Sequence, residues 1–175
     1  MANTVYTGAG QVLDSDVRYV KWVGKTKGGK EVSIELEKAI CRSNPDWTFA
    51  EKDDTTATVE FEGLYTDEAL AADDLTEPWK LTTADGITAG AGEIILRTGV
   101  FYIGTSAADA KRVGLTRGGG SFVVERNFRD INADDDPGSV VGRIDKTGGR
   151  PKLKFTALQW LTKVSDLYSC IKTAT

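Results

Sequence analysis

Histidine is absent from this sequence of 175 residues. Without an imidazole the chain can build neither a Ser-His-Asp or Cys-His nucleophile pair nor a His-ligated zinc site. It also lacks the side chain whose ordinary pKa best suits general acid–base catalysis at neutral pH. We therefore expect a protein that is not an enzyme, and the sequence gives no reason to assign a catalytic residue, a metal site or a cofactor.

The low content of cysteine and proline and the lack of long apolar runs exclude further classes of protein. The two cysteines, Cys41 and Cys170, have no metal-ligand spacing and fit a reducing compartment. With 4 Pro and 19 Gly, the chain has the background content of both, which argues against disorder. No apolar run approaches the length of a membrane span, and residues 1–17 lack a basic start and an apolar core, so we expect neither membrane insertion nor secretion. One domain covering residues 1–175 is the simplest organisation.

Charge is distributed unevenly along the chain. The net charge of −4 argues against nonspecific binding of duplex DNA through a basic face. Residues 1–90 carry 9 Lys+Arg and 17 Asp+Glu, whereas residues 91–175 carry 13 and 9. The split has two interpretations: ordinary solvation of different surfaces, or contacts between opposite halves of neighbouring subunits, which would build rings or filaments.

Alternating sequences predict a β-rich fold. Apolar and polar residues alternate over 31–37, 58–65 and 152–158, which predicts strands with one buried and one wet face. The runs 101–103 and 122–124 are aromatic and β-branched and are bounded by glycine, as is typical of strands.

Two segments have a helical period instead. Trp160, Val164, Leu167 and Ile171 recur as one apolar stripe and predict a helix that packs on the core. Residues 66–72 predict a shorter helix with Thr66 as its N-cap.

A possible internal repeat appears at an offset of 90 residues. Residues 23–35 align with residues 113–125 through a Gly-rich turn and an alternating strand, and 59–61 echo 153–155. This predicts pseudo-repeat halves of about 17–90 and 100–175. The alternative is that a common turn arose twice by chance.

No motif in the chain carries a strong chemical signal. Gly24-Lys25-Thr26 lacks the first glycine of a phosphate loop and precedes a strand. The acidic segment 130–138 places oxygen ligands at alternate positions, but it has Asp135 where a calcium loop needs glycine and Val141 where it needs glutamate. We interpret it as a loop between strands.

The chain resembles the major tail tube proteins of long-tailed, siphovirus-like bacteriophages. The resemblance rests on 99–104, on a Gly-Leu-Thr-Arg-Gly-Gly stretch within 113–119, on 125–131 with its Glu-Arg pair and the following aspartates, and on the return 138–143. A second piece, 25–65, contains Lys-Thr-Lys-x-Gly-Lys and Val-Glu-Phe-Glu-Gly-x-Tyr.

This resemblance implies a mainly β fold with one or two helices: a β-sandwich or barrel plus a flanking helix. It implies a structural virion protein that self-assembles into stacked rings of six subunits and so forms the hollow tail tube. The implied partners are other copies of the chain, the tape measure, tail terminator and distal tail proteins, and double-stranded DNA that passes through without specific binding. The implied location is the virion tail, assembled in the host bacterial cytoplasm.

Within this interpretation, an acidic lumen would repel DNA phosphates. Either of two wet strand faces could supply it, or each could be an ordinary solvated surface: Glu31, Ser33, Glu35 and Glu37, or Thr58, Glu60 and Glu62. Residues 1–16 are expected to form a flexible N-terminal arm that becomes ordered on assembly. Candidate contacts between subunits lie in loops: Arg42, Asp53, Asp54, Asp130, Asn132, Asp134, Asp135, Asp136 and Arg143.

Three alternatives remain open. One is another phage-related tube or connector component. Another is a non-enzymatic β-sandwich module that binds carbohydrate or protein through Trp47, Trp79 or Tyr65. The least favoured is an enzyme that assembles a carboxylate pair from distant loops.

Overall fold

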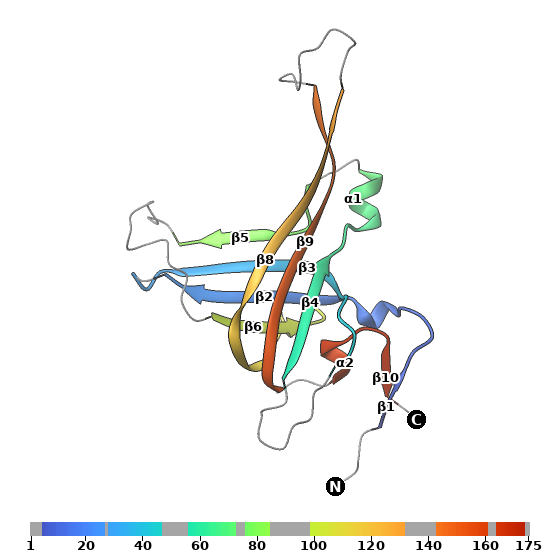
Figure 1. The fold of residues 1–175 in the computed structure, drawn as a ribbon, viewed down its shortest axis with the longest axis vertical. Helices are drawn as coiled ribbons and strands as arrows, with labels where there is room; N and C mark the ends of the chain where they lie inside the picture. The colour runs from blue at the N-terminus through green and yellow to red at the C-terminus, as the bar shows by residue number, and fades with distance from the viewer. Residues whose placement is uncertain are drawn as a thin grey trace.

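The structure, a computed structural model, describes residues 5–26, 28–46, 56–72, 76–84, 99–131, 143–160 and 164–173. Most of these residues lie in β-strands, as predicted (Figure 1). The strands are β1 (Tyr6–Gly8), β2 (Arg18–Lys25), β3 (Glu31–Cys41), β4 (Ala57–Gly63), β5 (Lys80–Thr83), β6 (Gly99–Gly104), β7 (Lys111–Arg112), β8 (Gly114–Asp130), β9 (Ile144–Trp160) and β10 (Ile171–Thr173). The helical elements are η1 (Asp14–Asp16), α1 (Asp67–Ala71) and α2 (Val164–Leu167).

Eight strands form one antiparallel sheet in the order β7-β6-β2-β3-β4-β9-β8, and β5 also pairs with β3. β4 and β5 pair with the same edge of β3: residues 32–35 pair with β5 and residues 39–41 pair with β4. Figure 1 shows β4, β8 and β9 crossing in front of β2, β3, β5 and β6 at a steep angle. The sheet therefore bends at the β3–β4 junction and packs on itself, in the manner of an orthogonal sandwich.

The core lies between these two layers. Phe101 of β6 stacks on Phe155 of β9 with ring centroids 4.1 Å apart, and Phe155 in turn faces Phe61 of β4 at 6.3 Å. The alternation predicted for β4 and β9 is confirmed, because Val59 and Phe61, like Leu153, Phe155 and Ala157, are buried. On β3, an extra residue between Leu36 and Ala39 relative to β2 reverses the alternation, so that Ala39 and Cys41 face the core.

The short helix was correctly predicted. The Thr66 hydroxyl oxygen accepts a hydrogen bond from the backbone N–H of Ala69 at 3.2 Å and caps α1. Because the cap and its target lie three residues apart, local sequence is enough to specify this helix start.

The helix predicted along the stripe from Trp160 to Ile171 is wrong. Trp160 is the last residue of β9, where it pairs with Gly114, and Ile171 begins β10. Of the described residues in between, only Val164–Leu167 form a helix, α2; it ends at the buried Leu167, and the next residue, Tyr168, is also buried. Leu167 and Tyr168 lie in the core and Ile171 packs against it, but pairing with β8 and β1 determines the backbone conformation at both ends of the segment.

The two copies of the possible repeat adopt different local structures. The first copy is a hairpin, with β2 and β3 joined through Thr26 and Gly29. The second copy lies within the single strand β8. The glycines expected to form its turn form a bulge between Thr116 and Gly120 instead, with positive φ at Gly118 and Gly119. The echoed segments 59–61 and 153–155 pair with each other across β4 and β9.

Part of the expected N-terminal arm has a defined place in the fold. β1 pairs with β10 in a separate two-stranded sheet, which brings the two ends of the described chain together. In the described residues, no helix is long and apolar enough to cross a membrane.

Candidate assembly surfaces

The longest feature of the molecule is the hairpin formed by β8 and β9. Its two strands pair from Gly114↔Trp160 to Asp130↔Ile144. Figure 1 shows the far end of this hairpin projecting beyond every other strand. We call this end the arm and define it as residues 126–131 and 143–149. The edge of β8 that faces away from β9 pairs with no other strand in the described part of the chain.

The arm exposes large apolar side chains. Phe128 is 63% exposed, Ile144 is 49% exposed and Ile131 is 48% exposed. Phe128 pairs with Lys146 and Asp130 pairs with Ile144, so Phe128 and Ile144 lie on the same face of the hairpin. Ile131 lies on the other face. Exposed apolar groups on a projecting element are typical of a surface that is buried on association.

A buried carboxylate fixes the base of the arm. The side chain of Glu77, only 8% exposed, accepts hydrogen bonds from Arg126 Nε at 2.7 Å and Nη2 at 3.0 Å, and from Lys146 Nζ at 3.0 Å. Trp79 Nε1 donates to the same carboxylate at 2.7 Å, and the Trp79 ring packs on Phe122 at 5.4 Å. The hydrogen bond from Arg126 is the main reason that the pKa of Glu77 falls to about 2, and Trp79 and Lys146 lower it further. We call Glu77, Trp79, Arg126 and Lys146 the Glu77 clamp.

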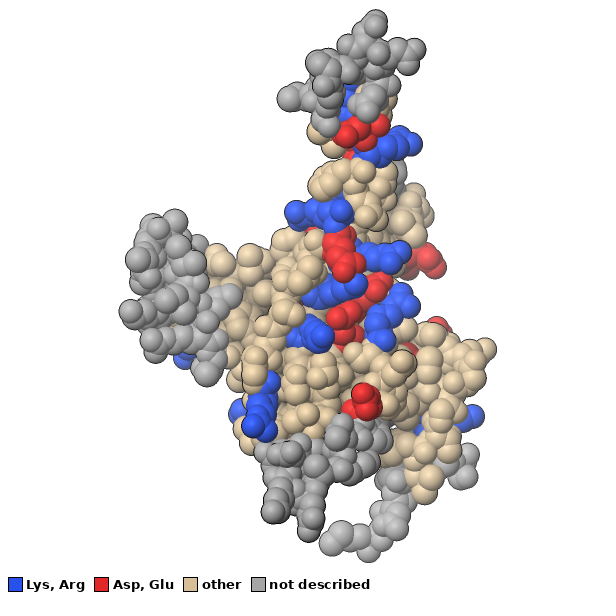
Figure 2. All heavy atoms as spheres, viewed as in Figure 1, with Lys and Arg blue, Asp and Glu red and all other residues tan. Residues whose placement is uncertain are grey.

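The outer side of β4, β9 and β8 is a surface of mixed charge rather than an acidic one. On β4, Glu60 and Glu62 lie directly opposite Lys154 and Lys152 of β9. Lys152 also binds Glu125 of β8 at 2.7 Å. Figure 2 shows blue and red side chains interleaved along the middle of this face. The wet face predicted at Thr58, Glu60 and Glu62 therefore exists, and each glutamate has a lysine as its cross-strand neighbour.

The predicted face on β3 is also paired with cations. Glu35 accepts hydrogen bonds from the Tyr19 hydroxyl at 2.8 Å and from Lys21 at 2.9 Å. Burial alone would raise the pKa of Glu35, but these hydrogen bonds outweigh it and lower the pKa; burial and the bond to Glu35 raise that of Tyr19. Glu37 binds Lys80 at 3.2 Å on an exposed surface. Glu31 is exposed, but the prediction that Ser33 lies on the wet face is wrong: Ser33 is buried, and its hydroxyl donates to Glu35 at 3.4 Å.

Three of the predicted loop contacts fall within the described chain. Arg42 directly follows β3 and binds Glu62 at 3.3 Å. Asp130 ends β8 and Arg143 precedes β9, where the Ile131 N–H donates to the Arg143 carbonyl at 2.8 Å. The remaining predicted residues lie outside the described residues: Asp53, Asp54, Asn132, Asp134, Asp135 and Asp136.

The aromatic residues suggested as ligand anchors do not form one site in the described chain. The Trp79 indole is engaged in the Glu77 clamp, and Tyr65 is half-buried just after β4. Trp47 lies outside the described residues.

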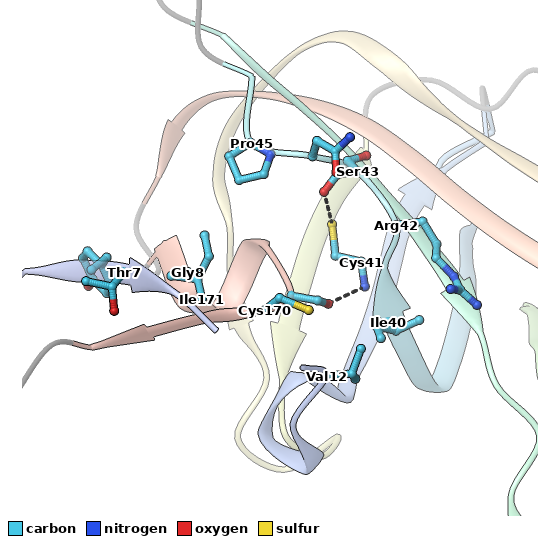
Figure 3. Close-up of a pocket in the computed structure, with 13 residues that line it drawn as sticks. Thr7, Gly8, Val12, Ile40, Cys41, Arg42, Ser43, Pro45, Cys170 and Ile171 are labelled. Atoms are coloured by element: carbon cyan, nitrogen blue, oxygen red, sulfur yellow. Dashed lines mark hydrogen bonds between the residues drawn. The ribbon is translucent and has the colours of Figure 1, made fainter. Parts of the chain in front are cut away.

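A cavity of about 680 Å³ lies where β1, the end of β3 and the segment before β10 meet (Figure 3). Its wall includes Cys41 and Cys170, which sequence spacing could not place together. Both cysteines are free thiols. Within the described residues, no group of three or more His, Cys, Asp or Glu side chains is arranged to hold a metal ion.

Sequence reasoning missed the Glu77 clamp and the thiol pair. Glu77 lies 49 residues from Arg126 and 69 from Lys146, so no local pattern indicates the cluster. No family model, curated protein or solved structure matches the chain.

Proposed function

We propose that this chain is a structural subunit that assembles with copies of itself into stacked rings, forming the hollow tail tube of a long-tailed phage. In this proposal six subunits form a ring, DNA passes through the channel without specific binding, and the subunit performs no catalysis. Tape measure, tail terminator and distal tail proteins contact the tube inside and at its ends. The observation that carries the proposal is the arm, which projects from a β body with Phe128 and Ile144 exposed.

The arm suits a contact between copies because it is both apolar and held in place. A second subunit that covers Phe128 and Ile144 would remove apolar surface from water, at about 25 cal/mol per Å². The Glu77 clamp fixes the base of the hairpin before association, so less conformational freedom is lost on binding. A contact between an arm and a different surface of the next copy is heterologous, and such contacts produce rings or filaments.

The sheet edges support ring formation. Among the described strands, β7 and β8 end the strand order of the large sheet. Open edges expose unpaired N–H and C=O groups, and pairing between neighbouring subunits in a closed ring satisfies them. In the proposed ring, strands of adjacent subunits continue one another around the channel.

The mixed-charge surface supports a channel that does not retain DNA, for a different reason from the acidic lumen expected from sequence. Lys152 and Lys154 lie opposite Glu62 and Glu60, so each of these two lysines has an acidic neighbour that weakens its attraction for phosphate.

Electron microscopy of the concentrated protein tests the assembly. We expect rings or tubes of uniform diameter with a central channel. The double variant Phe128→Ser with Ile144→Ser should keep its fold by circular dichroism and remain monomeric by light scattering. Leu70→Ser on α1, a residue that is 56% exposed and far from the arm in sequence, is the matched control and should assemble normally.

Two results would count against the proposal. Wild-type protein that stays monomeric across salt and protein concentration would contradict self-assembly. A double variant that forms the same tubes as wild type would show that the arm does not carry the contact.

A further inference from the structure

We propose that Cys41 and Cys170 are a thiol pair that a small disulfide oxidant closes into an intramolecular disulfide, which anchors the C-terminal strand to the end of β3. Cys41 is the last residue of β3, and Cys170 directly precedes β10. Both line the cavity described above, and they are the only two cysteines in the chain.

Backbone geometry holds the two segments against each other. The N–H of Cys41 donates a hydrogen bond to the hydroxyl of Ser169, the residue before Cys170, at 3.1 Å. Figure 3 shows the Cys170 sulfur beside this bond, whereas the Cys41 sulfur is directed away from it, toward the Ser43 carbonyl at 3.8 Å. Ser43, Cys41 and Cys170 all line this cavity, so the proposed disulfide requires the Cys41 side chain to turn from Ser43 toward Cys170 within it.

The backbone at Cys170 is in an unusual conformation. Its φ is +59°, in the left-handed region that residues with a side chain rarely adopt. The Cys170 carbonyl accepts a hydrogen bond from Ala9 N–H at 2.6 Å, so this residue joins the N-terminal segment to the C-terminal one. β1 and β10 pair with each other over only three residues each. A disulfide at Cys170 would therefore anchor both strands to the end of β3.

The chemistry follows from the difference in burial between the two thiols. Cys170 is half-buried and reacts first: its thiolate attacks one sulfur of glutathione disulfide, forms a mixed disulfide and releases one glutathione. Cys41 is 6% exposed and burial raises the pKa of its thiol, so it is protected from the oxidant. Its thiolate then attacks the Cys170 sulfur and releases the second glutathione. The pair loses two protons and two electrons, and the oxidant gains them.

The biological consequence, unlike the chemistry, rests on the proposed function. A subunit assembled in a reducing cytoplasm keeps both thiols free, and release into an oxidising medium lets the disulfide form. Closure would then follow assembly and hold the chain ends within the finished tube.

The test uses the reduced, monomeric full-length chain and glutathione disulfide. Intact mass under non-reducing conditions should fall by about 2 Da, with no thiol left for alkylation and with the chain still monomeric on a non-reducing gel. The melting temperature should rise by about 4 °C or more and return to its original value on reduction.

Two variants assign the roles. Cys41→Ser should stop at the mixed disulfide with glutathione on Cys170. Cys170→Ser should react with glutathione disulfide at least tenfold more slowly than Cys41→Ser, because its remaining thiol is buried.

The wild-type result decides the proposal even if a variant fails to fold. A wild-type chain that retains glutathione on Cys170, or that cross-links only between molecules, would overturn it. The measurement requires no tube formation, so it is independent of the outcome of the assembly experiment.

Discussion

The Glu77 clamp gives a stability prediction whose size can be worked from the structure. Glu77→Gln removes the charge of the carboxylate and replaces one of its two acceptor oxygens with an NH2 group, so some of the donors from Arg126, Lys146 and Trp79 lose their acceptor and the others lose charge assistance. The pKa of Glu77 is about 2 in the fold against an ordinary value of 4.5. At 1.36 kcal/mol per pH unit, this difference sets a ceiling of about 3.4 kcal/mol on the stability gained from ionisation.

Solvent lowers that ceiling. The side chain of Arg126 is 45% exposed and that of Lys146 is 33% exposed, so water and salt screen both ion pairs. We therefore expect Glu77→Gln to reduce the free energy of unfolding at pH 7 by about 1–2 kcal/mol.

The sign of the pH dependence follows from the lowered pKa. The contribution of Glu77 is fully present above its unfolded pKa of 4.5 and is lost as the pH falls through 4.5 toward 2. Urea unfolding at pH 7, 4.5 and 2.5, followed by fluorescence and circular dichroism, should show wild type losing its advantage over Glu77→Gln across that interval.

Glu125→Gln is the matched control, because Glu125 binds Lys152 at 2.7 Å on the same hairpin but is 52% exposed. Its cost should stay below about 1 kcal/mol. Equal costs for the two variants, or a Glu77→Gln protein whose stability depends on pH as strongly as that of wild type, would refute the reasoning.

Two further substitutions test the packing of the two layers. Gly120→Ala would place a Cβ 2.6 Å from the Lys154 carbonyl oxygen and 2.7 Å from the Phe101 ring, so we expect a loss of about 1–3 kcal/mol by urea unfolding. Gly148→Ala, which meets no atom within 4 Å, should change stability little, and equal effects would contradict the close approach of β8 to β6. Phe155→Ala removes the ring between Phe101 and Phe61 and should cost about 3–5 kcal/mol by the same measurement; a cost below 1 kcal/mol would mean that this stack is not central to the core.

The strands were largely predictable because their signals are periodic. The alternation over 58–65 and 152–158 identified which side chains of β4 and β9 are buried. It did not reveal that β8 and β9 run for 17 residues each, because the glycines at 118–120 suggested a turn. The bulge and the arm depend on pairing between strands, which the single-strand pattern does not contain.

The candidate surfaces were predicted only in outline. Sequence identified Glu60, Glu62 and Glu35 as wet-face residues, and the structure adds the cations that face them. The lysines of β9 are about 90 residues away along the chain, so the net charge of either face could not be read from one strand.

The sequence by itself determined the local features: the β class, the inward faces of β4 and β9, and the start of α1 at Thr66. Each depends on residues within a few positions of one another, where alternation or a cap acts directly on the backbone. Only the tertiary structure decided that Trp160 ends a strand, that Glu77 binds the arm, and that Cys41 and Cys170 line one cavity. These features depend on partners far apart in sequence, because β-sheet hydrogen bonds and buried ion pairs form wherever the folded backbone brings their groups together.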